Sequence, residues 1–324
     1  DSFLNFSLKK ELLKSINELG FNNPTPIQSK VIPHLMSSDQ DLIASAQTGT
    51  GKTAAFGLPL LDLTNTKVTN VQTLILCPTR ELCIQITNDL LTYSKYLKNI
   101  NILSVYGGVK IEKQIKSLKK GPQIVVGTPG RTNDLIRRKK LIIGNIDRLI
   151  LDEADEMLSM GFKEDLEAII QQTPKKKQIL LFSATMTQKV VGVTKKYMKN
   201  SLEIAVARVN RAADNVEHIF YVVKPRDRYE VVKRIADMNP DIYGIVFCRT
   251  RRETKDIAIK LMNDHYNADT IHGDLSQSER DDVMRRFRNG QLQILVATDV
   301  AARGLDVEDL THIINYNLPD DDEV

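Results

Sequence analysis

Short apolar runs rich in β-branched residues alternate with amphipathic stretches along nearly the whole chain. In the first part of the chain, the clearest apolar runs are residues 41–45, 73–77, 123–127, 148–151 and 178–182. Nearly continuous apolar strands separated by helical patterns are typical of parallel sheets that are covered by helices on both faces. The sequence therefore predicts an α/β fold with mostly parallel sheets.

The alternation is interrupted once, near Ala205 to Asn215, where polar and charged residues replace the apolar runs. It restarts with strand-like runs at residues 218–223, 244–248, 293–297 and 311–315. A chain of 324 residues has the length of about two ordinary domains. We therefore predict two tandem domains, residues 1–207 and 216–324, joined by a linker at residues 208–215.

Composition excludes several classes of protein. The 45 basic and 41 acidic residues give a net charge of +4, which by itself does not indicate a nucleic-acid-binding protein. No apolar stretch is long enough to predict a transmembrane helix. Cys77, Cys83 and Cys248 form no CxxC pair, so we expect neither a disulfide framework nor a zinc site. We expect a protein of the reducing cytoplasm, without a membrane partner.

A glycine-rich segment, Ala46-Gln-Thr-Gly-Thr-Gly-Lys-Thr53, follows the first apolar run and precedes an apolar helical stretch. Its glycines let backbone N–H groups approach phosphate oxygens, Lys52 can reach the β- and γ-phosphates, and the Thr53 hydroxyl can bind Mg²⁺. The strict phosphate-loop pattern has glycine where this chain has Ala46. The predicted phosphate-binding residues are Thr48, Gly49, Thr50, Gly51, Lys52 and Thr53.

Two carboxylates, Asp152 and Glu153, directly follow the apolar run at residues 148–151. The carboxyl ends of strands are where ligands bind in open α/β sheets. We predict that Asp152 belongs to the Mg²⁺ shell and that Glu153 orients or deprotonates an attacking water. Acidic residues also favour the start of a helix for electrostatic reasons alone, but the nearby phosphate loop favours the catalytic interpretation.

With residues 46–53 and Asp152-Glu-Ala-Asp155, the chain resembles the DEAD-box RNA helicases of bacterial type. The other motifs of that family follow in order over essentially the entire chain. Residues 20–28 resemble the Q motif, with Phe3 at the upstream aromatic position. Further resemblances are motif Ia at 78–82, the GG element at 107–108, motif Ib at 128–131, motif III at 183–185, motif IV at 246–250, the QxxR element at 277–280 and motif V at 297–306.

The resemblance implies two RecA-like P-loop NTPase domains in a monomeric hydrolase that uses ATP and Mg²⁺. It implies that Gln28 reads adenine and that Phe21 stacks on it, so that ATP is preferred over GTP; a side-chain amide can bond adenine N6 and N7 at once. Gly304 and Asp306 would reach the nucleotide from the second domain. The catalytic candidates are Lys52, Asp152, Glu153, Ser183 and Thr185.

Ser183 and Thr185 resemble the residues that couple hydrolysis to strand separation. Thr185 and Gln188 also have capping-box spacing, so the start of a helix is an alternative role for Thr185. The same alternative applies to Gln277 and Arg280, because Ser276 and Glu279 have capping-box spacing.

The residues that the resemblance implies for RNA share backbone N–H groups, helix N-termini or arginine charge, which bind phosphates without reading bases. They are Pro78, Thr79, Arg80, Gly107, Gly108, Thr128, Pro129, Gly130, Arg131, Arg249, Thr250, Gln277, Arg280, Thr298, Asp299 and Arg303. Stacking aromatic residues are scarce, so we expect binding that does not depend on RNA sequence.

In this family, the segment after Asn317-Leu-Pro319 is motif VI, which is rich in arginine, whereas this chain ends in Asp320-Asp-Asp-Glu-Val324. We expect a second domain that is incomplete at its C-terminus. An arginine finger contributes about 10³–10⁵ in rate, so we expect this chain to bind ATP and Mg²⁺ but to hydrolyse ATP and separate RNA strands poorly.

The leading hypothesis is an ATP-dependent RNA helicase that separates short duplexes by domain closure. A DNA helicase or translocase and an ATP-gated RNA clamp without strand separation remain alternatives. A small-molecule kinase with a phosphate loop is more distant, because it does not explain the motifs of the second half.

Overall fold

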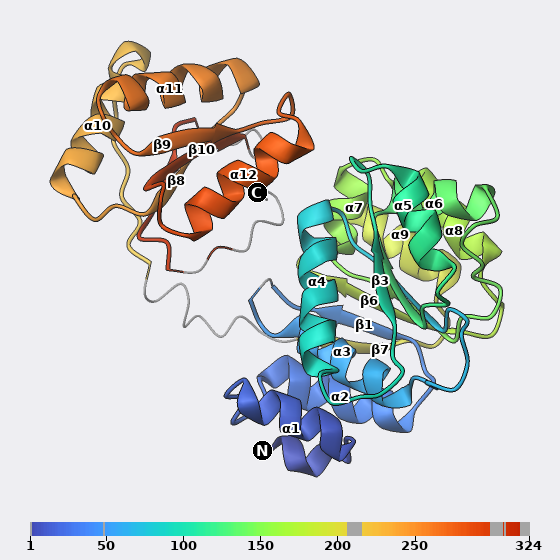
Figure 1. Cartoon of the computed structure of the whole chain (residues 1–324). Coiled ribbons are helices and arrows are strands. Elements are labelled where there is room, and N and C mark those ends of the chain that lie inside the picture. Colours follow the sequence, from blue (N-terminus) through green and yellow to red (C-terminus); the bar gives the residue numbers. More distant parts are fainter. Residues whose placement is uncertain (1, 48, 206–215, 299–306, 308, 318–324) are drawn as a thin grey trace. The chain divides into compact units, whose positions relative to one another are not determined.

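The computed structural model describes residues 2–47, 49–205, 216–298, 307 and 309–317 (Figure 1). The chain divides into two compact units, residues 1–212 and 213–324. The division falls near the predicted linker at residues 208–215, which lies outside the described residues, so the predicted domain bounds stay a prediction. Of the predicted site residues, the following also lie outside them: Thr48, Asp299, Arg303, Gly304 and Asp306.

In its described part, the first unit contains a seven-stranded sheet with the strand order β3-β4-β2-β5-β6-β1-β7, in which neighbouring strands run parallel. The strands are β1 (Leu42–Ser45), β2 (Thr73–Leu76), β3 (Ile102–Val105), β4 (Ile124–Gly127), β5 (Arg148–Leu151), β6 (Gln178–Ser183) and β7 (Leu202–Ala205).

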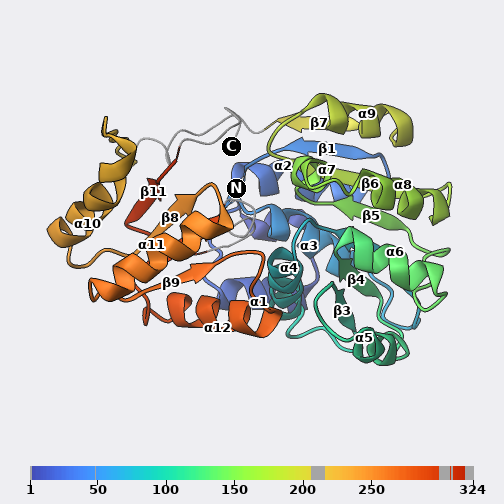
Figure 2. The same cartoon turned by 90° about the horizontal axis from the view of Figure 1, so that it is seen from above.

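Helices cover both faces of this sheet (Figures 1 and 2). One face carries the 3₁₀ helix η1 (Phe3–Phe6), α1 (Lys10–Glu18), α2 (Pro26–Ser37), α3 (Lys52–Leu63) and α4 (Arg80–Tyr93). The other carries α5 (Ile111–Leu118), α6 (Pro129–Arg137), α7 (Ala154–Ser159), α8 (Lys163–Gln172) and α9 (Gln188–Tyr197).

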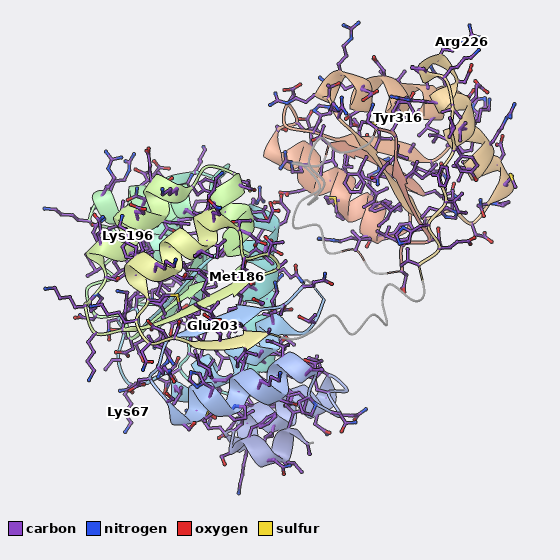
Figure 3. All side chains as sticks on the ribbon, turned by 180° about the vertical axis from the view of Figure 1, so that it is seen from behind. Lys67, Met186, Lys196, Glu203, Arg226 and Tyr316 are labelled. Carbon is purple, nitrogen blue, oxygen red and sulfur yellow. The ribbon has the colours of Figure 1, made fainter. Side chains whose placement is uncertain are left out.

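Most positions of the central strands are apolar because both of their faces are buried. In β1, Leu42 and Ala44 pack in the cluster with α1–α4, whereas Ile43 packs in the cluster with α5–α9. Side chains fill the space between sheet and helices (Figure 3). The sheet therefore has two buried cores, one on each face, as the apolar runs predict.

The second unit contains, in its described part, a four-stranded parallel sheet with the order β11-β8-β10-β9. Its strands are β8 (Gly244–Cys248), β9 (Ala268–Ile271), β10 (Ile294–Thr298) and β11 (His312–Asn315). The 3₁₀ helix η2 (Pro225–Asp227) leads into α10 (Arg228–Met238), which packs with α11 (Arg251–Asn263) on one face. The other face is covered by α12 (Gln277–Arg288). The predicted fold class, two tandem units with parallel sheets, is confirmed.

One predicted strand is wrong. Residues 218–223 form no strand, although they are rich in β-branched and aromatic residues. Phe220 and Val222 are 87% and 92% exposed, so the segment has neither a strand partner nor a covering layer within the described residues. Since strand propensity mainly reports packing against neighbours, an apolar run without such neighbours remains irregular.

No helix in the described part of the chain is both long and apolar enough to span a lipid bilayer.

Candidate nucleotide and nucleic-acid sites

The strand order of the first unit sorts the predicted site residues into two groups. The phosphate loop, Asp152 and Ser183 lie at the carboxyl ends of the adjacent strands β1, β5 and β6. The segments after β2, β3 and β4 hold the residues that the resemblance assigns to RNA. Because parallel strands end at one edge of a sheet, each group is brought together at that edge.

The phosphate loop connects β1 to α3 through two glycines in the left-handed region. Gly49 has a φ of +76° and Gly51 a φ of +88°, a conformation that favours glycine. Lys52 and Thr53 open α3, so the backbone N–H groups of its first turn are available to an anion. A hydrogen bond from Ala46 N to the Ser183 carbonyl (3.0 Å) ties the start of the loop to β6.

Gln28 lies 4% exposed at the start of α2, against the phosphate loop. Its Oε1 accepts a hydrogen bond from Thr25 N (2.9 Å), and its Nε2 donates one to the Gly51 carbonyl (3.2 Å). Thr25 Oγ1 donates to the Thr50 carbonyl (2.9 Å). The amide of Gln28 thus holds the loop as well as capping a helix, and its role as adenine reader stays a prediction.

Phe21 follows α1 and is partly buried. Its ring lies 6.0 Å from the ring of Phe3 and 6.0 Å from the ring of Tyr93. Phe3 itself is 4% exposed and belongs to the core. The two sequence-predicted aromatic residues therefore contact each other, and stacking of Phe21 on adenine stays a prediction.

Lys52 and Asp152 form a buried pair between the phosphate loop and the end of β5. Their side chains are 6% and 3% exposed, and the distance from Lys52 Nζ to Asp152 Oδ1 is 3.7 Å, too long for a hydrogen bond. Among the described residues, Lys52 Nζ has no hydrogen-bond partner. Burial raises the pKa of Asp152, although the charge of Lys52 acts in the opposite direction. A buried ammonium without a hydrogen-bond acceptor fits a site that receives phosphate oxygens.

Glu153 is held in an unusual backbone conformation at the end of β5. It has a φ of 51° and a ψ of 52°, in the left-handed region that non-glycine residues rarely adopt. Burial, followed by the charge of neighbouring Asp152, raises the pKa of Glu153 to about 7. A carboxylate with that pKa is suited to accept a proton near neutral pH.

The raised pKa predicts that Glu153→Gln stabilises the folded chain increasingly as the pH rises from about 4.5 to about 7. Folding raises the pKa of Glu153 from its ordinary value of 4.5 to about 7, so the cost of ionising the buried carboxylate begins above pH 4.5 and is complete above about pH 7. Glutamine removes that cost. We expect a gain of about 3 kcal/mol near pH 8.5 and of less than about 1 kcal/mol near pH 5. Thermal unfolding without nucleotide or Mg²⁺ measures it; an equal gain with exposed Glu164→Gln would contradict the assignment.

Asp155, Thr185 and Ser183 connect the ends of β5 and β6. Asp155 Oδ2 accepts hydrogen bonds from Thr185 N (2.9 Å) and Thr185 Oγ1 (2.8 Å). Ser183 Oγ donates to the Thr185 carbonyl (2.7 Å). The alternative role of Thr185 as a helix cap is wrong, because α9 is capped by Thr187, whose side chain accepts from Val190 N. Thr185 thus links the acidic motif to the serine–alanine–threonine segment.

The segments assigned to RNA in the first unit open two helices and one turn. Thr79 caps α4 by accepting from Leu82 N (3.2 Å), with Pro78 just before it. The Arg80 guanidinium lies 4.9 Å from the centre of the Tyr106 ring. Gly107 and Gly108 form a turn after β3, and Gly108 has a φ of +81°. Thr128 precedes α6, whose first three residues are Pro129, Gly130 and Arg131.

Gly127, the last residue of β4, packs closely against the start of α6 beside the predicted RNA-binding residue Thr128. A Cβ at Gly127 would lie 2.1 Å from Thr132 Oγ1 and 2.9 Å from Val105 Cγ2. Glycine at this position therefore lets α6 begin directly against the strand end. The signal in the sequence is its position just before Thr128, but spacing alone does not show the close approach.

We expect Gly127→Ala to destabilise the chain by about 2 kcal/mol, because the added methyl group would overpack the junction of β4 and α6. Gly192→Ala is the matched control. A Cβ at Gly192 meets nothing within 4 Å, and Gly192 lies inside α9, so alanine there should stabilise by about 0.5–1 kcal/mol. Denaturant unfolding of both variants measures the difference; equal effects would show that the approach at Gly127 has no consequence.

In the second unit, the predicted RNA residues also follow strand ends. Thr250 caps α11 after β8, and Arg249 N donates to Asn317 Oδ1 (3.1 Å). Gln277 opens α12, for which Ser276 and Glu279 form a capping box, as the alternative interpretation predicts. Arg280 Nη2 donates to the His272 carbonyl (3.4 Å). Thr298 ends β10 and is buried.

Taken together, the parallel sheets and the buried lysine at a glycine loop define a P-loop type of nucleotide site. Comparison with known families agrees: the family "DEAD/DEAH box helicase" matches residues 25–193, and "Helicase conserved C-terminal domain" matches residues 227–324. The chain belongs to the DEAD/DEAH box helicase family.

Several relatives match nearly the whole chain. The chain is 46% identical over 321 residues to the ATP-dependent RNA helicase CshA of Listeria monocytogenes. The aligned region covers 99% of this chain and 61% of that protein. The CshA protein of Streptococcus pneumoniae is also 46% identical, with the same coverage. This chain thus spans about 61% of the length of these two relatives.

Solved structures are similar as well. A DEAD box protein from Methanococcus jannaschii is 44% identical, with a TM-score of 0.62 over 99% of this chain and 86% of that chain. S. cerevisiae Dbp5 bound to RNA and ADP BeF3 is 32% identical, with a TM-score of 0.87 over 99% of this chain and 82% of that chain.

Proposed function

We propose that this chain works as an ATP-dependent RNA helicase that binds the RNA backbone and separates short duplexes. The observation that carries the proposal is the buried Lys52 ammonium, which has no hydrogen-bond partner among the described residues and lies beside Asp152 and the phosphate loop. The family and the names of its relatives support ATP as the nucleotide and RNA as the nucleic acid.

In this proposal, Lys52 and the first backbone N–H groups of α3 hold the phosphates, while Gln28 and Phe21 hold the base. The residues suited to bind Mg²⁺ are Asp152 and the Thr53 hydroxyl; when bound, the ion would neutralise charge on the phosphates. Glu153, with its pKa of about 7, orients and accepts a proton from the attacking water.

The hydrogen bonds of Asp155 with Thr185 offer a path from the nucleotide to the rest of the unit. They connect the acidic motif after β5 with the end of β6. A shift of Asp155 on hydrolysis would therefore move Thr185 and, through it, Ser183. We propose that this connection couples the state of the nucleotide to RNA binding.

Because ATP and RNA are both present in the cytoplasm, that compartment stays the proposed location.

The decisive experiment measures ATP hydrolysis and strand separation with RNA and DNA duplexes of the same sequence, on this chain and on a version that continues past Val324. Stimulation of hydrolysis by RNA, together with ATP-dependent separation of the RNA duplex, is the expected result. Equal stimulation by DNA would favour a DNA translocase. Tight RNA binding with ATP but no separation would favour an RNA clamp.

A further inference from the structure

Gln114, in the middle of α5, is a buried polar residue that no motif includes. The residue is 7% exposed, and its side-chain amide uses both of its ends. Oε1 accepts a hydrogen bond from Arg131 Nη1 (2.9 Å), and Nε2 donates one to the carbonyl of Tyr106 (3.1 Å). A buried amide that is hydrogen-bonded at both ends is fixed in orientation.

The two groups that Gln114 contacts both hold the glycine turn. Tyr106 directly precedes Gly107, and its carbonyl is held by Gln114. Val109 directly follows Gly108, and its carbonyl accepts from Arg131 Nη2 (3.0 Å). The turn is therefore held on both sides by two side chains that are hydrogen-bonded to each other. Such restraint matters here, because glycine has more backbone freedom than any other residue.

The same network reaches the third segment assigned to RNA. The Arg80 guanidinium lies 4.9 Å from the centre of the Tyr106 ring, within range of a cation–π contact. Arg131 opens α6 directly after Thr128 and Pro129. The segments after β2, β3 and β4 thus meet at Tyr106 and Gln114, although they are far apart in sequence.

We infer that Gln114 is a positioning residue for RNA binding, which fixes the Gly107–Gly108 turn and orients Arg131 without touching the RNA itself. Arg131 then acts in part through the turn, since at least two of its five N–H donors are used inside the protein. The inference rests on the proposed function, because it names what holds the RNA-binding surface of the first unit.

The test compares Gln114→Leu with Gln123→Leu. Gln123 is also a buried glutamine (2% exposed), and its amide bonds Asn101 N (2.8 Å) and the Val68 carbonyl (2.9 Å). Gln123 directly precedes β4, however, and so lies at the amino ends of the strands, whereas the glycine turn lies at their carboxyl ends. Both variants should lower the melting temperature, so loss of stability alone does not distinguish them.

RNA affinity is measured by fluorescence anisotropy with a labelled uridine homopolymer and an ATP analogue that is not hydrolysed. We expect Gln114→Leu to weaken RNA binding about tenfold and Gln123→Leu by less than about twofold, because of these two glutamines only Gln114 is hydrogen-bonded to a residue that flanks the turn. Nucleotide affinity should be unchanged in both variants. Faster amide hydrogen exchange at Gly107 and Gly108 should accompany the loss in Gln114→Leu only.

Two further variants keep the test valid if leucine at Gln114 prevents folding. Gln114→Glu still accepts from Arg131 but cannot donate to the Tyr106 carbonyl, and Arg131→Lys keeps the charge but loses the planar fork. Each should weaken RNA binding, and Gln114→Glu with Arg131→Lys should weaken it by less than the product of the single effects.

Unchanged RNA affinity in Gln114→Leu or Gln114→Glu, while the wild-type chain binds RNA, would overturn the inference and leave the proposed function intact. An equal loss in Gln123→Leu would also overturn it, because the effect would then be general destabilisation. A wild-type chain that binds nucleotide but no RNA would overturn the proposed function and this inference with it.

Discussion

Replacing Lys52 by alanine is expected to abolish ATP binding. The Lys52 ammonium is buried beside the phosphate loop and, among the described residues, has no hydrogen-bond partner, so it is available for a charge-assisted bond to a phosphate oxygen. Such bonds are about twice as strong as neutral ones, and we expect a loss of affinity of about a hundredfold or more. Isothermal titration with ATP and with ADP measures it.

The same substitution should leave the chain folded. Asp152 would lose its ion pair with Lys52, but burial already raises the pKa of Asp152, and without the lysine its pKa would rise further. The carboxylate can therefore take up a proton instead of remaining charged and unpaired. Lys52→Met, which keeps the apolar stem, should fold with a similar melting temperature and bind ATP equally poorly.

Lys177→Ala is the control for loss of a lysine in the same unit, because Lys177 Nζ donates to the Pro174 carbonyl (3.0 Å) before β6, at the opposite edge from the phosphate loop. It should bind ATP normally. Normal ATP affinity in Lys52→Ala would show that the unsatisfied ammonium is not a phosphate ligand, and the nucleotide site would have to be sought elsewhere.

The sequence predicts the central strands and the edge strand β11 well, but it predicts the other edge strands poorly. Strands β1, β2, β4, β5 and β6 are apolar runs because both of their faces are buried. Strands β3, β7 and β9, which are not among the clear runs, all lie at sheet edges. Polar residues such as Ser104, Glu203 and Asp269 interrupt them, since an edge strand is covered less completely. Residues 218–223 show the opposite error: they are an apolar run that has no neighbouring strand in the described part of the chain.

Placement of the site at strand ends follows from the sequence, but its internal connections do not. A motif such as residues 46–53 needs one strand, one loop and one helix, all contiguous in the chain. By contrast, the bonds of Asp155 with Thr185, and of Gln114 with Arg131, depend on strand order. The spacing of Thr185 and Gln188 favours Thr185 as the N-cap of α9, but the N-cap is Thr187, which carries the same hydroxyl group two positions later.

Replacing Glu153 by glutamine is expected to preserve ATP binding and to block its hydrolysis. The side chain stands beside Asp152 at the end of β5, where the left-handed backbone at Glu153 directs the chain into α7. Glutamine has nearly the same size and can still orient a water, but it cannot accept a proton. Since its pKa is about 7, the carboxylate is poised to do so near neutral pH.

Loss of a general base lowers the rate by about 10²–10⁴, and we expect a reduction in that range for RNA-stimulated hydrolysis by Glu153→Gln in a version that continues past Val324. Glu164→Gln, which removes an exposed carboxylate from the first turn of α8, should hydrolyse ATP at the wild-type rate.

The pH dependence of the rate shows whether Glu153 accepts the proton or only orients the water. If it accepts the proton, the wild-type rate should rise through about pH 7 and the residual rate of the variant should not. If both rates rise in parallel, Glu153 is not the base, and the buried pair of Lys52 and Asp152 would have to act on the water without it.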